Sequence, residues 1–500
     1  MDFLNRTDDL AALDDLWTSR EAQFFVVWGR RRVGKTELLT KFAEGKRAFY
    51  FEATDTTERG QLRSFSEELA AVGANELLAA QPVGNWAGAL AAMTQYASTG
   101  ERTLIILDEF QYLAVQQREL GTLLNNWWRT TGRTLPLVFI IAGSEVSFFR
   151  EEVLGGRMYG RRGGQLPLAP FDYSAAALFV PGYSDEDKVR TYAVCGGMPY
   201  YLDRFLDTRP LAENILRNVL YRDGFLHEEA DLLLRQELSD PRRYFSVLDA
   251  IARGATRNSE IAQRTGLDSA QTYQTLDMLE RLELVEQLRP ATASPNSKKT
   301  SYAIRDGFLN FYFRFVEPYK SRMRTRADAE RHLEQTVLPN LDAFVSKPAW
   351  ERICQDYIKR QETEARAVGA WWGKVQVAPR RTEDREIDAV AIDPDGKVIA
   401  TGSCKWTNSP LDSGEETLLG QIEPHIPGAE AVARHYFFSR SGFTEQLQKL
   451  AASDPNRYRL ITPETIYQYS SDCQCAQFAA HSGPARAAAP AQHRARLRQP

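Results

Sequence analysis

The sequence predicts an α/β fold for the N-terminal part of the chain. Four apolar runs, at residues 24–28, 48–53, 104–110 and 137–144, are rich in β-branched and aromatic residues. Runs of this kind are typical of the buried strands of a parallel sheet. Helical patterns separate them, so we expect a layered α/β domain over residues 1–171.

The pattern changes along the chain, and 500 residues exceed what one hydrophobic core usually serves. A mostly helical lid is expected over 172–241. Residues 242–305 show three helical patterns and then two short strands around a polar turn, which is the order of a winged helix. A helical connector over 306–345 precedes a smaller α/β domain over 346–470. The Ala-, Pro-, Gln- and Arg-rich segment 471–500 predicts a disordered tail.

Composition and charge exclude several classes of protein. The net charge of −4 argues against binding of nucleic acid through bulk charge, so any DNA contact needs a local basic patch. The cysteines are too few and too scattered for a disulfide framework: Cys195, Cys354, Cys404, Cys473 and Cys475. The sequence has no apolar run of about 18 residues and no signal-peptide pattern, which predicts a cytoplasmic protein without a membrane contact.

A phosphate-binding motif directly follows the first predicted strand. It has the spacing G-x-x-x-x-G-K-T, and its residues are Gly29, Arg30, Arg31, Arg32, Val33, Gly34, Lys35 and Thr36. The glycines and the following helix N-terminus let backbone N–H groups surround phosphate oxygens. Lys35 brings a charge to the β- and γ-phosphates, and the Thr36 hydroxyl is a ligand for Mg²⁺. The motif therefore predicts a site for ATP and Mg²⁺.

Polar residues end the third and fourth predicted strands. Asp108 is placed to hold the Mg²⁺ ion, and Glu109 to polarise the attacking water as a general base. Without the phosphate-binding motif, such an acidic pair is more often a solvated strand end. Ser144 lies where a polar group would sense the γ-phosphate, and its alternative role is a helix cap.

A Gly-rich basic loop follows the fourth predicted strand. It carries Arg157, Arg161 and Arg162 within LGGRMYGRRGG. One arginine, for which we take Arg161, would stabilise charge in the transition state of phosphoryl transfer. The alternative is a flexible, solvated basic loop.

Several motifs in order resemble a known family: FLNR, GRRRVGKT, LDEFQYLA, IAGS, MYGR and CGGMPYYL. Together they resemble the archaeal-type ATPases of the AAA+/STAND class of P-loop proteins. The resemblance implies that Arg6 contacts the adenine side of the nucleotide and that Gly197 and Pro199 close over it. It also implies a switch that changes its domain arrangement on nucleotide exchange or hydrolysis.

The C-terminal α/β domain resembles a domain of unknown function that is often fused to these ATPases and is similar to PD-(D/E)xK nucleases. EIDAVAID and the strand ending in CKW carry this resemblance. It implies that Asp388, Lys405 and Glu351 hold a metal and position water. Ser403 stands where the fold has its second acid, which argues against cleavage, and Glu386 is the alternative acid. The other interpretation is an ordinary strand with solvated charges.

The winged helix gives a mixed signal for DNA binding. Its third helix carries Asp277, Glu280 and Arg281, whereas its wing carries only basic residues, Arg289, Lys298 and Lys299. Specific phosphate binding usually shows a stronger basic footprint. The module therefore either contacts DNA through its wing or packs inside an ATPase switch.

Three functions remain open at this point. The first is an ATPase switch that rearranges the winged helix and the nuclease-like domain. The second is an ATP-dependent DNA-processing nuclease, and the third is a non-hydrolysing ATP sensor that binds DNA or a protein. Glu109 favours the first, because a sensor needs no general base.

Overall fold

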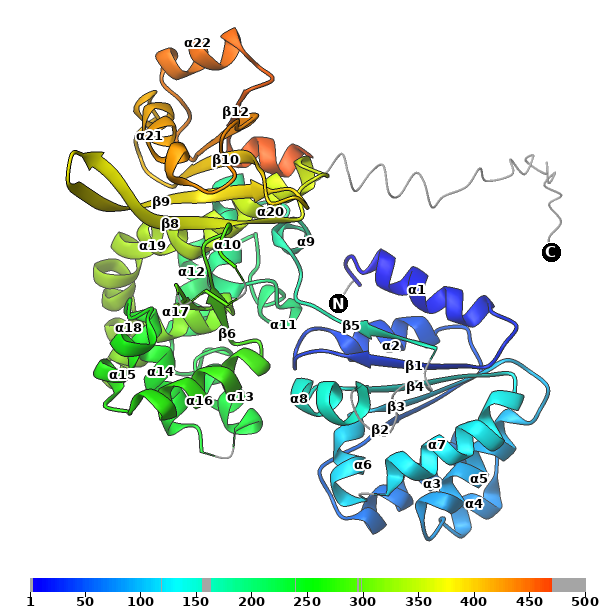
Figure 1. Ribbon diagram of the computed structural model, residues 1–500. Helices are drawn as coiled ribbons and strands as arrows, with labels where there is room; N and C mark the ends of the chain where they lie inside the picture. The colour runs from blue at the N-terminus through cyan, green and yellow to red at the C-terminus, as the bar shows by residue number, and fades with distance from the viewer. Residues whose placement is uncertain are drawn as a thin grey trace, which may run out of the picture.

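The N-terminal domain contains a five-stranded parallel sheet with the order β2-β3-β4-β1-β5 (Figure 1). The computed structural model describes residues 3–117, 119–154, 163–238, 240–294, 296–297 and 299–469. The strands are β1 (Gln23–Trp28), β2 (Ala48–Glu52), β3 (Thr103–Asp108), β4 (Leu137–Gly143) and β5 (Gly164–Pro167). The four predicted strands are present. The sequence did not predict β5, because it is a short, half-exposed edge strand bounded by Gly and Pro rather than an apolar run.

Helices cover both faces of this sheet, as the period of its apolar residues requires (Figure 1). One face carries α1 (Thr7–Thr18) and α2 (Lys35–Ala43). The other face carries α3 (Glu58–Gly73), α4 (Glu76–Ala80), α5 (Trp86–Ala97), α6 (Phe110–Gln116) and α7 (Leu120–Thr130). The P-loop joins β1 to α2, so it lies at the carboxyl edge of the sheet, where α/β proteins bind ligands.

The lid is helical, as predicted. After α8 (Val146–Phe148) and a π-helical turn at Phe149–Leu154, the lid contains α9 (Tyr173–Ala177), α10 (Asp185–Cys195), α11 (Pro199–Leu202), α12 (Leu211–Ile215), a π-helical turn at Leu216–Leu220 and α13 (Glu229–Glu237). Ser184 caps α10 and Asp172 caps α9, each by accepting a backbone N–H bond.

The next segment has the helix and strand order of a winged helix. It contains α14 (Arg242–Ala252), α15 (Asn258–Thr265), α16 (Ser269–Arg281) and the antiparallel wing strands β6 (Val285–Leu288) and β7 (Ser301–Ile304). The connector follows with α17 (Gly307–Phe315), a 3-10 turn at Glu317–Arg322, α18 (Arg326–His332), α19 (Leu338–Phe344) and π-helical turns at Leu333–Val337 and Val345–Trp350.

The C-terminal domain is a mixed sheet with the order β12-β11-β10-β9-β8. Its elements are α20 (Glu351–Gln361), β8 (Ala367–Ala378), β9 (Arg381–Ile392), β10 (Val398–Lys405), α21 (Gly414–Ile422), β11 (Arg434–Ser439), α22 (Glu445–Ser453) and β12 (Tyr458–Ile461), with a 3-10 turn at Glu423–His425. The long antiparallel pair β8 and β9 projects from the domain as an arm (Figure 1). The short strand β12 was not predicted.

One hydrophobic core runs from the α1 and α2 face of the first sheet through the lid, the winged helix and the connector to the α20 face of the C-terminal sheet. The opposite faces of the two sheets have their own cores. Within the described ranges, no helix combines the length and the apolar character needed to cross a bilayer. The predicted tail at 471–500 and Arg161 lie outside the described residues.

Candidate functional site

The P-loop wraps around the ammonium group of Lys35. Gly34 has a φ of 90°, and a Cβ atom at Gly29 would overlap the backbone carbonyl of Leu168, so both positions favour glycine. The buried Lys35 Nζ donates to the carbonyl oxygens of Gly29 at 3.0 Å and Arg30 at 3.1 Å. These neutral acceptors bind an ammonium more weakly than anionic phosphate oxygens do.

Charge around Lys35 favours its protonated form despite its burial. Burial lowers the pKa of Lys35, and the carboxylates of Glu109 and Asp108 act in the opposite direction. The motif predicts that this cation binds the phosphates of a nucleotide.

Asp108 lies at the end of β3 in a buried cluster of oxygen atoms. Its Oδ2 accepts bonds from the Thr36 hydroxyl at 3.1 Å and the Tyr50 hydroxyl at 2.6 Å. Burial and then the charge of Asp108 raise the pKa of Tyr50, so its hydroxyl stays a donor. Hard oxygen donors of this kind fit Mg²⁺ better than any soft metal.

No three His, Cys, Asp or Glu side chains come together as a metal site in the part of the chain that the structure describes. A nucleotide-associated Mg²⁺ usually has only one or two carboxylates in its shell and takes its other ligands from phosphates and water. Asp108 and the Thr36 hydroxyl would supply the protein part of such a shell.

Glu109 is held by two partners that the strand order brings together. Ser144, directly after β4, donates from Oγ to Glu109 Oε2 at 2.7 Å. Gln111 donates both to the same carboxylate and to Ser144 Oγ, the second bond at 3.2 Å. Helix α8 begins after Glu145 as its N-cap, so Ser144 is not the cap of that helix. The contact links the expected sensor position to the expected base.

Backbone strain is concentrated around this site. Seven non-glycine residues of the described chain have a positive φ, and four of them, Asn5, Arg6, Arg32 and Glu109, belong to the segments around the P-loop. Glu109, the residue before α6, has a left-handed backbone with a φ of 49°, and its side chain accepts the bond from Ser144. Non-glycine residues in this region cost energy and gather at functional sites.

The N-terminal segment and the lid meet on the other side of the P-loop. Arg6 donates to the carbonyl of Val33 at 2.8 Å, and its guanidinium lies 4.1 Å from the centre of the Phe171 ring. A Cβ atom at Gly197 would overlap the Phe171 carbonyl, and a Cβ atom at Gly34 would lie 3.6 Å from Pro199. The structure thus brings together Arg6, Gly197 and Pro199, which the family resemblance had singled out.

Arg30 of the P-loop forms a buried ion pair with the connector. Its Nη2 lies 2.8 Å from Asp306 Oδ2. The other carboxylate oxygen of Asp306 accepts the Leu309 N–H at 2.8 Å and caps α17. One aspartate therefore both begins the helix after the winged helix and binds the P-loop.

Arg31 and Arg32 bind the lid in the same manner. Arg31 Nε lies 3.2 Å from Glu237 Oε1 at the end of α13. Arg32 forms an ion pair with Glu229 at the start of α13, and its guanidinium lies 4.9 Å from the centre of the Tyr200 ring. Burial raises the pKa of Glu237, against the charges of Arg31 and Arg30. All three variable arginines of the P-loop thus pair with acids of the lid and connector.

The winged helix contacts the segment that follows Ser144. Arg150 lies 2.6 Å from Glu283, and Arg281 at the end of α16 lies 2.9 Å from Glu151. Arg30 and Ser144 also share a small cavity with Leu282 and Leu284 of the winged helix. The sensor position is therefore next to the turn between α16 and β6.

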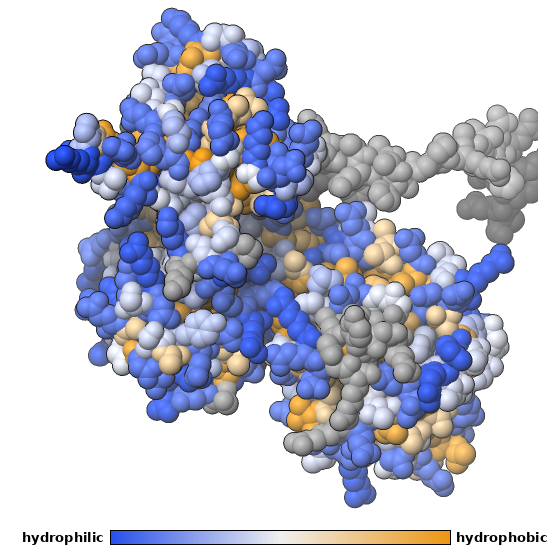
Figure 2. All heavy atoms as spheres, in the orientation of Figure 1, coloured by the Kyte–Doolittle hydropathy of each residue, from blue (hydrophilic) through white to orange (hydrophobic). Residues whose placement is uncertain are grey.

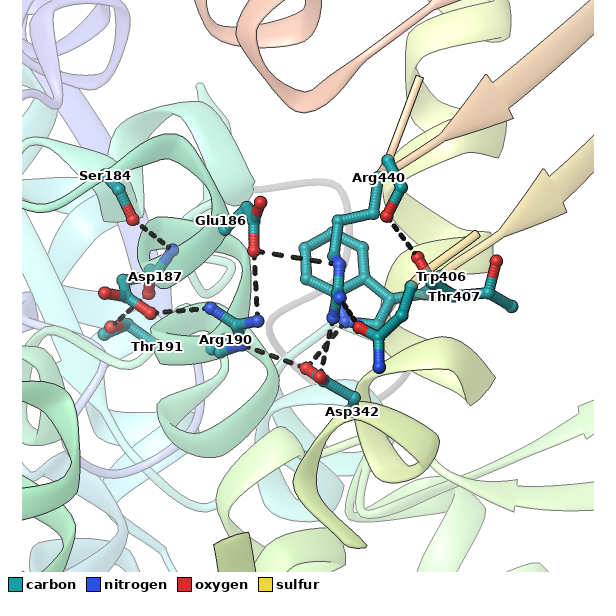
Figure 3. A network of polar contacts seen from close by, with 11 residues as sticks. Ser184, Glu186, Asp187, Arg190, Thr191, Asp342, Trp406, Thr407 and Arg440 are labelled. Carbon is teal, nitrogen blue, oxygen red and sulfur yellow. Dashed lines mark hydrogen bonds and ion pairs between the residues drawn. The ribbon is translucent and has the colours of Figure 1, made fainter. Parts of the chain in front are cut away.

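A polar network joins the lid to the C-terminal domain (Figure 3). Asp342 of α19 binds Arg190 of α10 at 3.0 Å, Arg440 after β11 at 2.6 Å and the Trp406 indole N–H at 3.0 Å. Glu186 of α10 adds bonds to Arg190 at 3.1 Å and Arg440 at 3.7 Å. Burial acts to raise the pKa of Asp342, but its hydrogen bonds with Trp406, Arg190 and Arg440 and the charge of Arg190 lower the pKa overall, so the carboxylate stays ionised.

The C-terminal sheet brings Asp388 and Lys405 together. Asp388 Oδ2 lies 3.2 Å from Lys405 Nζ and accepts the Cys404 N–H at 2.7 Å. Ser403 donates to Glu415 of α21 at 2.7 Å, and the same Glu415 oxygen lies 3.7 Å from Lys405. Glu415, which the sequence did not single out, thus occupies the neighbourhood of the acid that Ser403 lacks. Burial opposes the charge of Lys405, but Asp388 and Glu415 raise its pKa.

Glu351 and Glu386 share Lys347 beside this pair. Lys347 Nζ lies 3.4 Å from Glu351 and 2.7 Å from Glu386. Burial, with a smaller effect of Asp388 and Glu386, raises the pKa of Glu351 to about 7, and Lys347 opposes the shift. The two acids therefore lie in one charged group with Asp388.

Six residues that hold the site in place were not predicted from the sequence: Tyr50, Gln111, Glu229, Glu237, Asp306 and Glu415. Gln111 lies two residues after Glu109, within the LDEFQYLA motif, so it carried a local signal. The acids that pair with the P-loop lie about 200 or more residues away in the sequence, and no local pattern marks them.

Three segments of the chain match known family models. Residues 3–205 match an ATPase domain predominantly from Archaea, residues 242–289 match an IclR helix-turn-helix domain, and residues 312–417 match Archaea bacterial proteins of unknown function. The chain therefore has an ATP-binding P-loop ATPase domain of archaeal type, a helix-turn-helix domain and a C-terminal region of that family.

Relatives with similar sequences come from Methanocaldococcus jannaschii. An uncharacterized protein is 27% identical over 407 residues, which are 81% of this chain and 87% of the relative. An uncharacterized ATP-binding protein is 44% identical over 45 residues, 9% of this chain and 76% of the relative.

Two solved structures are similar in fold. The Walker-type ATPase of Pyrococcus abyssi has a TM-score of 0.48 and 18% identity, covering 63% of this chain and 96% of its own. The ORC2 protein of Aeropyrum pernix has a TM-score of 0.40 and 14% identity, and the match covers 67% of this chain and 96% of that protein.

Proposed function

We propose that the chain is an ATP-hydrolysing switch of the AAA+/STAND type, in which the nucleotide controls how the P-loop holds the lid and connector. Lys35 binds the β- and γ-phosphates, while Thr36 and Asp108 hold Mg²⁺. When bound, this ion neutralises charge on the phosphate oxygens. Arg6 and Pro199 bind the nucleoside side of the site, where Arg6 approaches Val33 and Pro199 approaches Gly34.

Hydrolysis depends on Glu109 as the general base. Its carboxylate accepts the proton of a water molecule that attacks the γ-phosphorus, and the products are ADP and inorganic phosphate. Ser144 and Gln111 hold the carboxylate in its unusual backbone setting. Loss of either hydrogen bond would let the Glu109 carboxylate turn toward the water. Ser144 and Gln111 therefore control when the base can act.

The observation that carries the switch proposal is the pairing of all three P-loop arginines with Asp306, Glu237 and Glu229. Phosphates bound in the loop and these carboxylates attract the same guanidinium groups. Breaking a buried ion pair costs several kcal/mol, so the two forms of the site differ substantially in energy. ATP binding therefore favours a looser attachment of α13 and α17 to the P-loop.

Hydrogen exchange of α13 and α17 tests this proposal. ATP with Mg²⁺ should speed backbone exchange in both helices of the wild type. Lys35→Ala should abolish the effect, because the phosphates lose their main cation. Lys41→Ala, on the exposed face of the same helix, is the matched control and should respond as the wild type does. Exchange rates of α13 and α17 that ATP leaves unchanged in the wild type would contradict the switch.

We also propose DNA as the partner that responds to this switch, in keeping with the helix-turn-helix domain. The contacts of Arg150 with Glu283 and of Arg281 with Glu151 support the connection, because they join the sensor segment to α16. ATP turnover measured with and without DNA tests it. A turnover rate that DNA leaves unchanged at saturating concentration would argue for a protein partner instead.

A second candidate function is metal-dependent cleavage of DNA by the C-terminal domain. The specific observation in its favour is Glu415, which contacts both Ser403 and Lys405 and replaces the missing acid in space. In this proposal Asp388 and Glu415 hold the metal, and Lys405 orients the water. Glu351 or Glu386 completes the acidic group.

Cleavage of plasmid DNA with Mg²⁺ or Mn²⁺ tests the second candidate. Asp388→Asn and Glu415→Gln should each abolish cleavage, whereas the control Glu445→Gln, on the exposed side of α22, should not. Wild-type protein that leaves DNA intact with both metals would exclude the nuclease. Activity gained by Ser403→Glu in that case would identify a binding domain derived from a nuclease.

A further inference from the structure

A cleft of about 1960 Å³ separates the winged helix from the C-terminal domain. The wing strands β6 and β7 form one wall, and the base of the arm formed by β8 and β9 forms the other. Residues of α17, α19 and α20 form its floor. The free end of the arm carries mostly hydrophilic side chains (Figure 2).

Direct contacts join the parts of the cleft to one another. The Ala291 N–H, in the loop after β6, donates to the Ala370 carbonyl of β8 at 2.8 Å. Arg352 of α20 forms an ion pair with Glu286 and donates to the Ile304 carbonyl at 3.1 Å. The first contact joins the two walls, and the contacts of Arg352 join the floor to the wing. The cleft therefore exists before any partner binds, which reduces the entropic cost of binding.

Exposed cations without an ion-pair partner line every side of the cleft. Arg289 and Lys299 lie on the wing, Arg314 on α17 and Lys374 on the arm, and no acid among the described residues pairs with any of them. The partly exposed ring of Trp372 lines the same cleft. Cations around an aromatic ring are typical of sites for single-stranded nucleic acid, where phosphates follow the charges and bases stack.

The usual DNA-binding helix of a winged helix is poorly suited here. The end of α16 is engaged, because Arg281 pairs with Glu151 of the ATPase domain and Asp277 of its own helix. The cleft offers a different surface, and Glu351 and Glu386 lie in its lining. A strand in the cleft would therefore pass beside the group that contains Asp388 and Lys405.

We propose that this cleft binds a single strand of DNA, with Arg289, Lys299, Arg314 and Lys374 on its phosphates and Trp372 against a base. A single strand bends between two nearby walls, whereas duplex DNA is stiff over about 150 base pairs. The inference rests on the proposed function only in taking DNA as the partner. Binding in the cleft needs neither ATP nor cleavage.

Fluorescence anisotropy with a labelled oligothymidine of about 20 nucleotides tests the proposal. Lys299→Glu combined with Lys374→Glu reverses one charge on each wall, and should weaken binding at least about tenfold. The slope of log affinity against log salt should become shallower by about 1.4, since each lost phosphate contact in a single strand removes about 0.7. Trp372→Ala should weaken binding without changing that slope.

The control carries the same change of net charge elsewhere. Arg129→Glu combined with Arg133→Glu alters two exposed arginines of the ATPase domain that have no ion pair among the described residues, and should bind as the wild type does. Equal losses in the two variants would show that only overall charge matters and would overturn the proposal. So would a wild type that binds no oligothymidine, or that binds a duplex or an RNA of the same length more tightly.

ATP turnover of both variants separates this test from the test of the switch. Retained turnover with lost DNA binding supports the cleft. Absent turnover in the wild type together with DNA binding that depends on Lys299 and Lys374 would reject the ATPase proposal and leave the cleft in place.

Discussion

Replacing Asp306 with asparagine tests whether ATP competes with the connector for the P-loop. The Arg30 guanidinium lies 2.8 Å from the Asp306 carboxylate, and the two side chains are only 9% and 2% exposed. Removing one partner of a buried ion pair costs about 3–5 kcal/mol. Asparagine keeps the cap of α17 and one hydrogen bond to Arg30, worth about 1 kcal/mol, so the net loss is about 2–4 kcal/mol.

This loss falls on the form in which Arg30 pairs with Asp306. If bound phosphates attract Arg30 away from Asp306, the substitution destabilises the ATP-bound form less than the ATP-free form. The difference in free energy then appears as tighter ATP binding. A difference of about 1.4 kcal/mol lowers the Kd about tenfold, so we expect Asp306→Asn to bind ATP at least that much more tightly. Isothermal titration calorimetry with a non-hydrolysable analogue and Mg²⁺ measures the change.

Asp328→Asn is the matched control, because it removes a half-exposed carboxylate near the start of the next connector helix, where Asp328 pairs with Arg331 and accepts bonds from Thr325. Its Kd for ATP should equal that of the wild type. A lower melting temperature of Asp306→Asn combined with an unchanged Kd would refute the reasoning. It would mean that Arg30 and Asp306 stay paired when ATP is bound and that the pair only stabilises the fold.

Three further predictions concern single residues. Lys35→Ala should weaken ATP binding by about 2–5 kcal/mol in calorimetry, whereas Lys41→Ala should not, and equal affinities would exclude the P-loop site. Glu109→Gln should keep ATP affinity and slow turnover about 10²-fold or more, while an unchanged rate would remove the general base. Burial raises the pKa of Glu351 from 4.5 to about 7. The folded form therefore gains stability as pH falls from about 8 toward 5 and loses it as pH rises through 7, by at most about 3 kcal/mol. Glu351→Gln should flatten this dependence in thermal unfolding, and a profile identical to the wild type would contradict the shift.

Local patterns in the sequence were enough to predict the sheet of the first domain and its P-loop. Apolar runs of five to eight residues mark buried parallel strands, because both of their faces are covered. The phosphate-binding motif depends on consecutive residues, so Lys35 and Thr36 stand where the spacing put them. The same holds for Asp108, because the carboxyl ends of β3 and β1 lie at the same edge of the sheet, with β4 between them.

Contacts between distant segments could not be predicted in the same way. Nothing near Arg30 in the sequence marks Asp306, and a capping aspartate before a helix is too common to indicate an ion pair. Glu415 was missed because the resemblance points to position 403 on the strand, whereas Glu415 reaches Ser403 from α21. Ser144 was placed correctly at the strand end, but its bond to Glu109 needs the three-dimensional order of β3 and β4.

The packing of α17 on α10 explains how a change at the P-loop would reach the C-terminal domain. Asp306, which pairs with Arg30, is followed by Gly307, and a Cβ atom there would overlap the backbone of Gly196 at the end of α10. Backbones in such close contact move together, since neither can shift without separating a dry interface. In its middle, α10 carries Arg190, which binds Asp342 and, through it, the C-terminal sheet. A shift of α17 by the P-loop would therefore displace the network in Figure 3 before it displaced the interior of either sheet. The arm wall of the proposed DNA cleft belongs to that C-terminal sheet, whereas the wing wall follows α16, which contacts the sensor segment. The two walls are thus connected to the nucleotide by separate routes, so a nucleotide-dependent change in either route would alter the separation between them.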